Sequence, residues 1–244
     1  MINDHPVKAC ATRGKYGAFN RHTVKGNWPH SCQQAGTGHG SNVLTRRTAG
    51  SSHPEGWNAA VRKLVITQNI TVDGSIEMLD DWFDPRGQVD NIDLLEEIHR
   101  QDALSDAFLV GRQTFEDLRG YWPTLSEDPT GVAGYLNEVA KYVVSNTLID
   151  PQWQHTTVLS GDPVVEVEAL KDAPGRDIVV TGSISLCHAL ITAGLVDEYR
   201  LFVYPIVQGR GRRLFPEGVQ LPRLRLLDAK AFRGGVTYSC YAPA

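Results

Sequence analysis

The sequence predicts an α/β domain in which one mostly parallel sheet carries helices on both faces and ends in an antiparallel hairpin. Three observations predict this fold class. From residue 62 onward, short apolar runs alternate with segments of helical periodicity, an order typical of parallel strands joined by crossover helices. Asp-Pro pairs at 128–129 and 162–163 indicate helix starts, because proline suits the first helical position. Gly234-Gly235 separates two final extended runs, as in a hairpin.

The first half of the predicted domain contains three strands and three helices. Apolar runs over 62–70, 107–110 and 142–144 predict the strands. Helical spacing predicts one helix capped by Asp90, a second directly after Gly111 and a third that begins at Asp128-Pro129. The apolar residues that give this helical spacing are Ile92, Leu94, Leu95, Ile98, Phe115, Leu118, Val132, Tyr135, Leu136 and Val139.

The second half continues the same alternation. One helix is expected to begin at Asp162-Pro163, and another to begin at Ser183 and end at Gly194. The apolar runs predict strands over 156–159, 178–180 and 199–204, and the two arms of the hairpin over 223–232 and 236–241. No internal repeat and no second core is visible, so the sequence predicts a single domain.

Residues 1–60 differ from the rest of the chain in charge and composition. They carry 7 Lys and Arg against 2 Asp and Glu, whereas residues 61–244 carry 17 against 26. They contain only six Leu, Ile, Val and Phe and show no periodicity, so they cannot bury enough apolar surface to offset the loss of conformational entropy. We therefore predict a disordered or non-native extension over 1–60, with Val61 as an alternative start, and one domain over 61–244.

The composition argues against proteins that coat nucleic acid or bind anionic membranes. The net charge is -4, so no overall positive field attracts polyanions. No apolar run reaches the roughly 20 residues of a transmembrane helix, and no secretory signal is recognisable, which predicts a cytoplasmic protein. The four cysteines lie far apart and are interpreted as free thiols, and the histidines lack the spacing of metal ligands, so no metal is expected.

Polar residues follow three of the predicted strands, at the strand ends where ligands gather in α/β sheets. The three segments are 111–114, 145–147 and 181–184. Glycines in the first and last segments would let the backbone turn tightly, and the free N–H groups of a following helix favour a pyrophosphate. Each segment alone is equally explained by a simple capped turn or loop.

Taken together and in order, these segments resemble the dihydrofolate reductase-like family, most closely the branch that contains the C-terminal domain of the bacterial bifunctional deaminase-reductase of riboflavin biosynthesis. The resemblance covers residues 62–242. Its most specific pieces are TVDG at 71–74, VGRQTFE at 110–116, VVSNT at 143–147, VTGSISL at 180–186 and PIVQGRGRRLF at 205–215. It implies a three-layer dihydrofolate reductase-like fold, with a mixed eight-stranded sheet and NADPH lying across the strand ends.

The resemblance also implies which residues contact NADPH. Arg112 would bind the phosphate that distinguishes NADPH from NADH, and many family members carry a basic residue where this chain has Asn146, so the preference for NADPH depends mainly on Arg112. The implied cofactor-binding residues are Thr71, Gly74, Gly111, Arg112, Thr114, Ser145, Asn146, Thr181, Gly182, Ser183 and Ile184.

The substrate side is indicated by an acidic and aromatic segment. Asp81, Trp82 and Phe83 offer stacking surfaces and a carboxylate for a flat heterocycle, and Trp122 would form another wall. The alternative for all four residues is ordinary packing or a solvated acidic loop. Arg210, Arg212 and Arg213 would receive a substrate phosphate, or else form a solvated face.

Asp73 is the candidate catalytic residue, because its turn follows the first predicted strand. Reduction of a C=N or C=O bond needs a proton as well as a hydride, and a shielded carboxyl group with a raised pKa would supply it. The alternative is that Asp73 only caps a turn.

Together these features predict an NADPH-dependent reductase of a small pterin- or pyrimidine-like heterocycle, or alternatively a non-catalytic nucleotide-binding module of the same fold. The hairpin at the sheet edge also suggests a homodimer.

Overall fold

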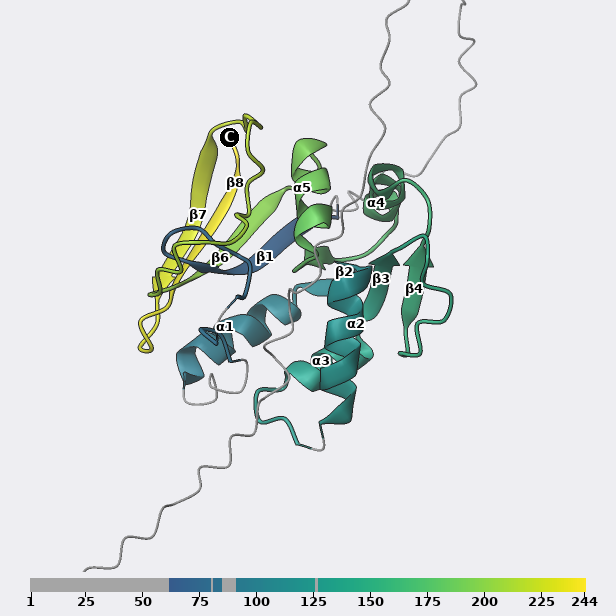
Figure 1. Ribbon diagram of the computed structural model, residues 1–244, viewed down its shortest axis with the longest axis horizontal. Coiled ribbons are helices and arrows are strands. Elements are labelled where there is room, and N and C mark those ends of the chain that lie inside the picture. Colours follow the sequence, from purple (N-terminus) through teal and green to yellow (C-terminus); the bar gives the residue numbers. More distant parts are fainter. Residues whose placement is uncertain (1–61, 80, 85–90, 126) are drawn as a thin grey trace, which may run out of the picture. The chain divides into compact units, whose positions relative to one another are not determined.

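The computed structural model describes residues 62–79, 81–84, 91–125 and 127–244 (Figure 1). The predictions for the extension over 1–60, for Val61 and for a cap at Asp90 lie outside these residues. Within them no helix is both long enough and apolar enough to cross a membrane.

One eight-stranded sheet forms the centre of the described domain, in the order β4-β3-β2-β5-β1-β6-β8-β7. All pairs are parallel except β6 with β8 and β8 with β7, which confirms the mixed, mostly parallel sheet and its C-terminal hairpin. The strands are β1 Leu64–Thr71, β2 Ser105–Gly111, β3 Ala140–Val144, β4 Thr156–Leu159, β5 Asp177–Val180, β6 Glu198–Tyr204, β7 Leu224–Ala231 and β8 Thr237–Pro243.

In the part of the chain that the structure describes, five α-helices and one short 3-10 helix accompany the sheet. They are α1 Ile92–Asp102, α2 Arg112–Tyr121, η3 Trp122–Thr124, α3 Val132–Glu138, α4 Pro163–Asp172 and α5 Ile184–Thr192. Successive side chains of a strand point to opposite faces, and β2 shows the consequence. Leu109 packs in one cluster with residues of α4 and α5, whereas Phe108 and Val110 pack in another with residues of α2 and α3. Helices therefore cover both faces of the sheet.

Helix α1 covers the face on which α2 and α3 lie. Phe202 and Tyr204 of β6 pack with Leu94 of α1. Their side chains lie on the same face as that of Glu198, and the register pairs Glu198 with Val65 of β1. Val65 pairs with Val179 of β5, which pairs with Phe108 of β2, so all these side chains share one face of the sheet. Two sites described below lie at opposite ends of the strands. One lies at the carboxyl ends of the strands and the other at the amino ends of β5 and β6.

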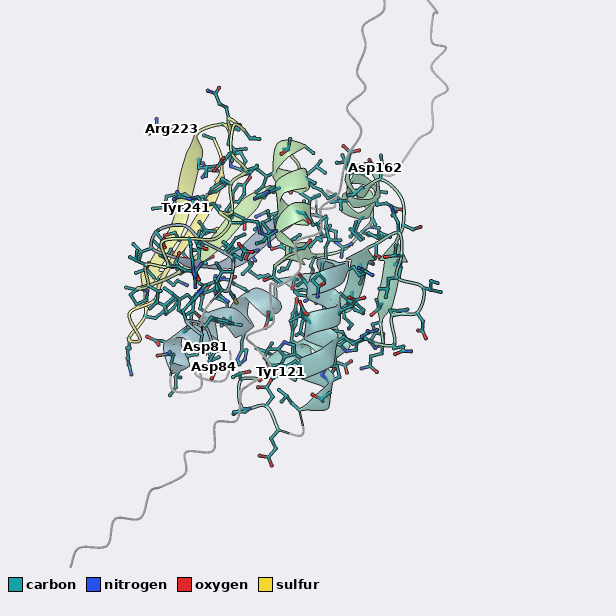
Figure 2. The ribbon with its side chains drawn as sticks, viewed as in Figure 1. Asp81, Asp84, Tyr121, Asp162, Arg223 and Tyr241 are labelled. Carbon is teal, nitrogen blue, oxygen red and sulfur yellow. The ribbon has the colours of Figure 1, made fainter. Side chains whose placement is uncertain are left out.

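Of two predicted helix starts, one agrees with the structure and the other does not. Asp162 caps α4 as expected, because its carboxylate accepts the N–H groups of Val164 and Val165 at 2.9 and 3.2 Å (Figure 2). Helix α3, in contrast, begins at Val132 and not at Pro129. Gly131 adopts a left-handed conformation with φ of 76°, which delays the helix, although the Asp128 carboxylate still accepts the Ala133 N–H at 2.7 Å.

Because every strand and helix described lies between residues 64 and 243, we expect a chain that begins at residue 61 to fold as the full chain does. Arg62 must be kept, since its buried guanidinium donates to the Arg176 carbonyl at 2.7 Å and pairs with Asp106. Thermal unfolding of the two chains should give melting temperatures within a few degrees. A drop of many degrees on removing residues 1–60 would show that they pack on the domain.

Candidate active site

Helices α2 and α5 begin side by side at the carboxyl ends of the neighbouring strands β2 and β5. The Gly111 N–H donates to the Gly182 carbonyl at 3.2 Å. A Cβ atom on Gly111 would collide with the Ser183 hydroxyl, and one on Gly182 would lie 2.9 Å from Thr114 Oγ1. Only glycine therefore allows the two segments to approach this closely. The structure brings together four of the predicted site residues, Gly111, Thr114, Gly182 and Ser183.

Neither of these two helices has a side chain that caps its N-terminus. Ser183 is the N-cap residue of α5, but its hydroxyl lies 3.1 Å from the Ser185 hydroxyl rather than on the backbone. Thr181 and Ile184, which flank Gly182 and Ser183, are half-buried. The first N–H groups of a helix have no partner within the helix and carry the positive end of its dipole. Two such ends at one corner form an arrangement suited to a pyrophosphate.

Arg112 lies at the first position of α2, next to this corner. Its side chain is half-exposed, and its closest described ionic contact is Glu116 at 3.9 Å. An exposed pair at this separation contributes little to stability. The guanidinium therefore stays available to a ligand.

Ser145 and Asn146 follow β3, next to the same corner, because Val144 pairs with Gly111 across the sheet. The Ser145 hydroxyl accepts the N–H groups of Thr147 and Leu148 at 3.2 and 3.0 Å. It therefore holds the turn after β3. Asn146 is exposed and is the residue of this pair better placed to meet a ligand.

Asp73 lies in the turn after β1, and its carboxylate accepts three hydrogen bonds. The Thr71 hydroxyl donates at 2.6 Å, the Gln208 N–H at 3.1 Å and the Gly209 N–H at 2.7 Å. These bonds stabilise the charged form and lower the pKa of Asp73 to about 2. The expectation of a raised pKa was wrong, because it assumed a shielded carboxyl group without donors. Gly74 completes the turn with φ of 86°.

The segment 205–213 after β6 is bound tightly to the Asp73 turn. The Val72 N–H donates to the Ile206 carbonyl at 2.9 Å, and Gln208 Nε2 lies 2.8 Å from the Ser75 hydroxyl. Sequence reasoning missed Gln208, because nothing local marks a residue whose partners Asp73, Ser75 and Glu77 lie more than 130 positions away. A pocket of about 240 Å³ opens here, lined by Asp73, Ser75, Gly209, Arg210, Gly211 and Arg213.

The three arginines of this segment differ in their contacts. Arg212 is committed to Glu77, which it contacts through Nη2 at 3.0 Å and through its backbone N–H at 2.9 Å. Arg210 and Arg213 both line the pocket beside Asp73. Two of the three arginines therefore lie at the pocket, whereas Arg212 fixes the loop through Glu77.

Aromatic side chains gather at the carboxyl end of β6. Trp82 and Phe83 pack on Tyr204 with ring centroids 5.5 and 5.6 Å apart, and Tyr204 pairs in register with Thr71. This places two of the predicted substrate residues near the Asp73 turn. The exposed Asp81 lies beside them in sequence, on the α1 side of the molecule (Figure 2).

Trp122 does not join this group. It is 5% exposed and packs with Phe115 and Trp153 in the core beneath α2 and α3, where its ring lies edge-on to Tyr121 at 5.0 Å. Trp122 is therefore a core residue and not a wall of the substrate site. No cluster of His, Cys, Asp and Glu side chains in the described parts of the chain could hold a metal ion.

The sequence also matches a family of known proteins. A model of the RibD C-terminal domain matches residues 62–238. The chain belongs to the RibD C-terminal domain family. A curated relative in this comparison, the uncharacterized protein YyaP of Bacillus subtilis, is 32% identical over 190 residues, which cover 75% of this chain and 96% of YyaP.

Solved structures confirm the dihydrofolate reductase-like fold of this RibD-family domain. RibD of Acinetobacter baumannii superposes with a TM-score of 0.54 at 14% identity, over 77% of this chain and 59% of that RibD. Dihydrofolate reductase of Enterococcus faecalis, solved with NADP(H), superposes with a TM-score of 0.50 at 17% identity, over 74% of this chain and 95% of the reductase. The chain thus has a reductase-like fold.

Proposed function

We propose that the protein is an NADPH-dependent reductase that transfers a hydride to a small pterin- or pyrimidine-like heterocycle. The observation that carries this proposal is the corner at which α2 and α5 begin. Two helix N-termini without side-chain caps meet there across a glycine contact of 3.2 Å between Gly111 and Gly182. Such a corner is suited to the pyrophosphate of a dinucleotide.

The residues around the corner fit the remaining parts of the cofactor. Backbone N–H groups of Ser183 and Ile184 would hold the pyrophosphate, Gly111, Arg112 and Thr114 would face the adenosine phosphate side, and Asn146 would face the ribose. When bound, NADPH supplies the hydride. The membership in the RibD family and the NADP(H) complex of the Enterococcus reductase support this choice.

The substrate would lie between the Asp73 turn and the aromatic side chains on Tyr204. Trp82 and Phe83 offer faces for stacking a planar ring. Since the pKa of Asp73 is about 2, its carboxylate is charged at neutral pH and does not donate a proton. In this proposal Asp73 is a positioning residue, which holds Thr71 and the segment 205–213 around the substrate.

The proposal is tested by cofactor binding followed by turnover. A thermal-shift measurement should show stabilisation by NADPH, about 2.7 kcal/mol at 100 times the dissociation constant. Steady-state NADPH oxidation is then measured with a panel of pterins, pyrimidines and quinones. Oxidation with one class identifies the substrate. Stabilisation by NADPH without turnover across the panel would favour a nucleotide-binding module, and no stabilisation by either NADPH or NADH would reject the cofactor site.

Arg112→Ala is expected to weaken binding of NADPH more than that of NADH. The expected contact with the phosphate of NADPH is a charge-assisted hydrogen bond worth about 1.5 to 3 kcal/mol, or roughly ten- to hundredfold in the dissociation constant. Titration of both cofactors by fluorescence measures the difference. Arg225→Ala on the outer strand β7, also exposed, serves as the control. Equal weakening of both cofactors by Arg112→Ala would place Arg112 elsewhere on the nucleotide.

The homodimer expected from the hairpin is part of the proposal. Strand β7 forms one edge of the sheet, and Leu226 and Leu227 on it are 54% and 40% exposed. Sedimentation velocity at several protein concentrations would detect the dimer, and a concentration-independent monomer would reject it.

A further inference from the structure

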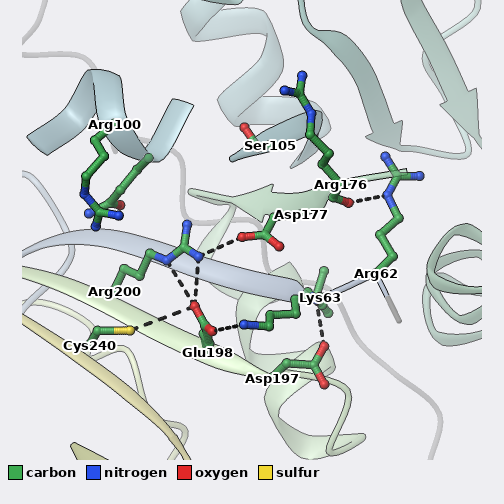
Figure 3. Close-up of polar contacts among 12 residues, drawn as sticks. Arg62, Lys63, Arg100, Ser105, Arg176, Asp177, Asp197, Glu198, Arg200 and Cys240 are labelled. Carbon is green, nitrogen blue, oxygen red and sulfur yellow. Dashed lines mark hydrogen bonds and ion pairs between the residues drawn. The ribbon is translucent and has the colours of Figure 1, made fainter. Parts of the chain in front are cut away.

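A second cavity lies at the opposite end of the strands from the proposed cofactor site. It opens at the amino ends of β5 and β6, between these strands, α1 and the C-terminal hairpin (Figure 3). Its volume is about 340 Å³. The residues that line it are Lys63, Arg100, Leu104, Asp177, Glu198, Arg200, Asp228, Tyr238 and Cys240. None of them belongs to the proposed reductase site.

Arg200 lines this cavity and is only 4% exposed. Its Nη2 donates to Asp177 at 2.7 Å and to Glu198 at 2.8 Å, as the dashed lines in Figure 3 show. Its Nη1 is equally buried but has no hydrogen-bond acceptor among the described residues. In Figure 3 this nitrogen points away from Glu198. A buried N–H group without an acceptor raises the free energy of the folded protein. A ligand that brought an acceptor to Nη1 would therefore gain binding free energy.

The charges around the cavity decide which kind of acceptor fits. The lining holds three cationic side chains, Lys63, Arg100 and Arg200, and three carboxylates, those of Asp177, Glu198 and Asp228. Lys63 pairs with Glu198 at 2.6 Å and Arg200 with Asp177 at 2.7 Å. The cluster is therefore balanced, and an anion at Nη1 would be repelled by carboxylates that are already in place.

We propose that this cavity binds an uncharged ligand whose carbonyl oxygen is flanked by an N–H group, as in a ureide or a lactam. The carbonyl accepts from Arg200 Nη1, and the neighbouring N–H donates to the Asp177 carboxylate, which lies beside the same guanidinium. The half-exposed Leu104 supplies apolar contact at the mouth of the cavity. The ligand thus satisfies the buried donor without adding a charge.

Ethyleneurea is the probe that tests the proposal, and its N,N′-dimethyl derivative is the matched control, because the carbonyl is kept and the N–H donors are lost. Binding to the full-length chain is followed by NMR titration at millimolar concentration, where a ligand of a few heavy atoms binds. Ethyleneurea should bind at least about tenfold more tightly than the dimethyl compound. Crystals soaked with ethyleneurea should show it within hydrogen-bond distance of Arg200 Nη1.

Leu104→Trp fills the mouth of the cavity without changing the buried charges and should abolish binding of ethyleneurea. Ile149→Trp is its control, since Ile149 is 95% exposed and does not line the cavity. Acetate and inorganic phosphate are tested in parallel. Tighter binding of either anion, equal binding of the two ureas, binding that survives Leu104→Trp, or water alone at Nη1 in the soaked crystals would each overturn the proposal.

Discussion

Gly111→Ala is expected to weaken NADPH binding by at least about tenfold, a loss of about 1.4 kcal/mol. The backbone of Gly111 has φ of -79°, which alanine adopts without strain. The effect therefore comes only from the new Cβ atom, which would collide with the Ser183 hydroxyl and lie 3.1 Å from the Ser183 Cβ. Separating the starts of α2 and α5 would disperse the N–H groups that are proposed to face the pyrophosphate. Fluorescence titration with NADPH measures the loss.

The same substitution should lower the free energy of unfolding by about 1 to 3 kcal/mol, the range for overpacked sites, as chemical denaturation would show. Gly134→Ala is the matched control. Gly134 lies within α3, and a Cβ atom there meets no heavy atom within 4 Å, so alanine should stabilise the helix by about 0.5 to 1 kcal/mol. If Gly111→Ala bound NADPH as tightly as the parent, the corner between β2 and β5 would not be the cofactor site.

This corner was predictable from the sequence because its signals are local. A buried strand that ends at Val180, followed at once by Gly182 and the N-cap Ser183, specifies both the turn and the start of α5. The same holds for β2 and Gly111. Neighbouring parallel strands then bring the two turns together, because their carboxyl ends lie at one edge of the sheet. The fold, and the meeting of these two turns at one corner, thus follow from short segments read in order.

The substrate side was less predictable, since it depends on contacts between distant parts of the chain. Trp82 and Trp122 look alike in sequence as aromatics in loops, yet Trp82 packs near the Asp73 turn and Trp122 in a core. Burial of an aromatic residue depends on which helix covers it, and local pattern does not encode that. The start of α3 was misplaced for a different reason, because Thr130 and the left-handed Gly131 extend the turn after Asp128.

Asp73 illustrates the same limit for electrostatics. Its sequence context suggests a free carboxyl group, but two of its three donors belong to Gln208 and Gly209, 135 and 136 positions along the chain. The Thr71 hydroxyl, together with these two N–H groups, lowers the pKa of Asp73 to about 2, below the ordinary value of 3.8. Because the folded-state pKa is lowered, the stabilisation from this carboxylate is fully present above about pH 4 and is lost as the pH falls toward 2. Asp73 should therefore contribute no titration to a pH–rate profile between pH 5 and 8.

Asp73→Asn is expected to lower turnover by at least about tenfold, as misplacement of groups around a substrate does, and to leave NADPH affinity nearly unchanged. Asparagine keeps one oxygen acceptor but presents an NH₂ group where the second oxygen was. At least one of the three donors, the Thr71 hydroxyl or the N–H of Gln208 or Gly209, therefore loses its acceptor. We expect the segment 205–213 to loosen as a result. Asp162→Asn at the start of α4 is the control, because asparagine also caps helices and turnover should not change.

Steady-state kinetics over pH 5 to 8 should show that Asp73→Asn is slower than the parent by the same factor throughout, since a positioning role has no titration in that range. A factor that varied with pH would restore a proton-transfer role to Asp73, and unaltered turnover would remove Asp73 from the mechanism and direct attention to Asp81.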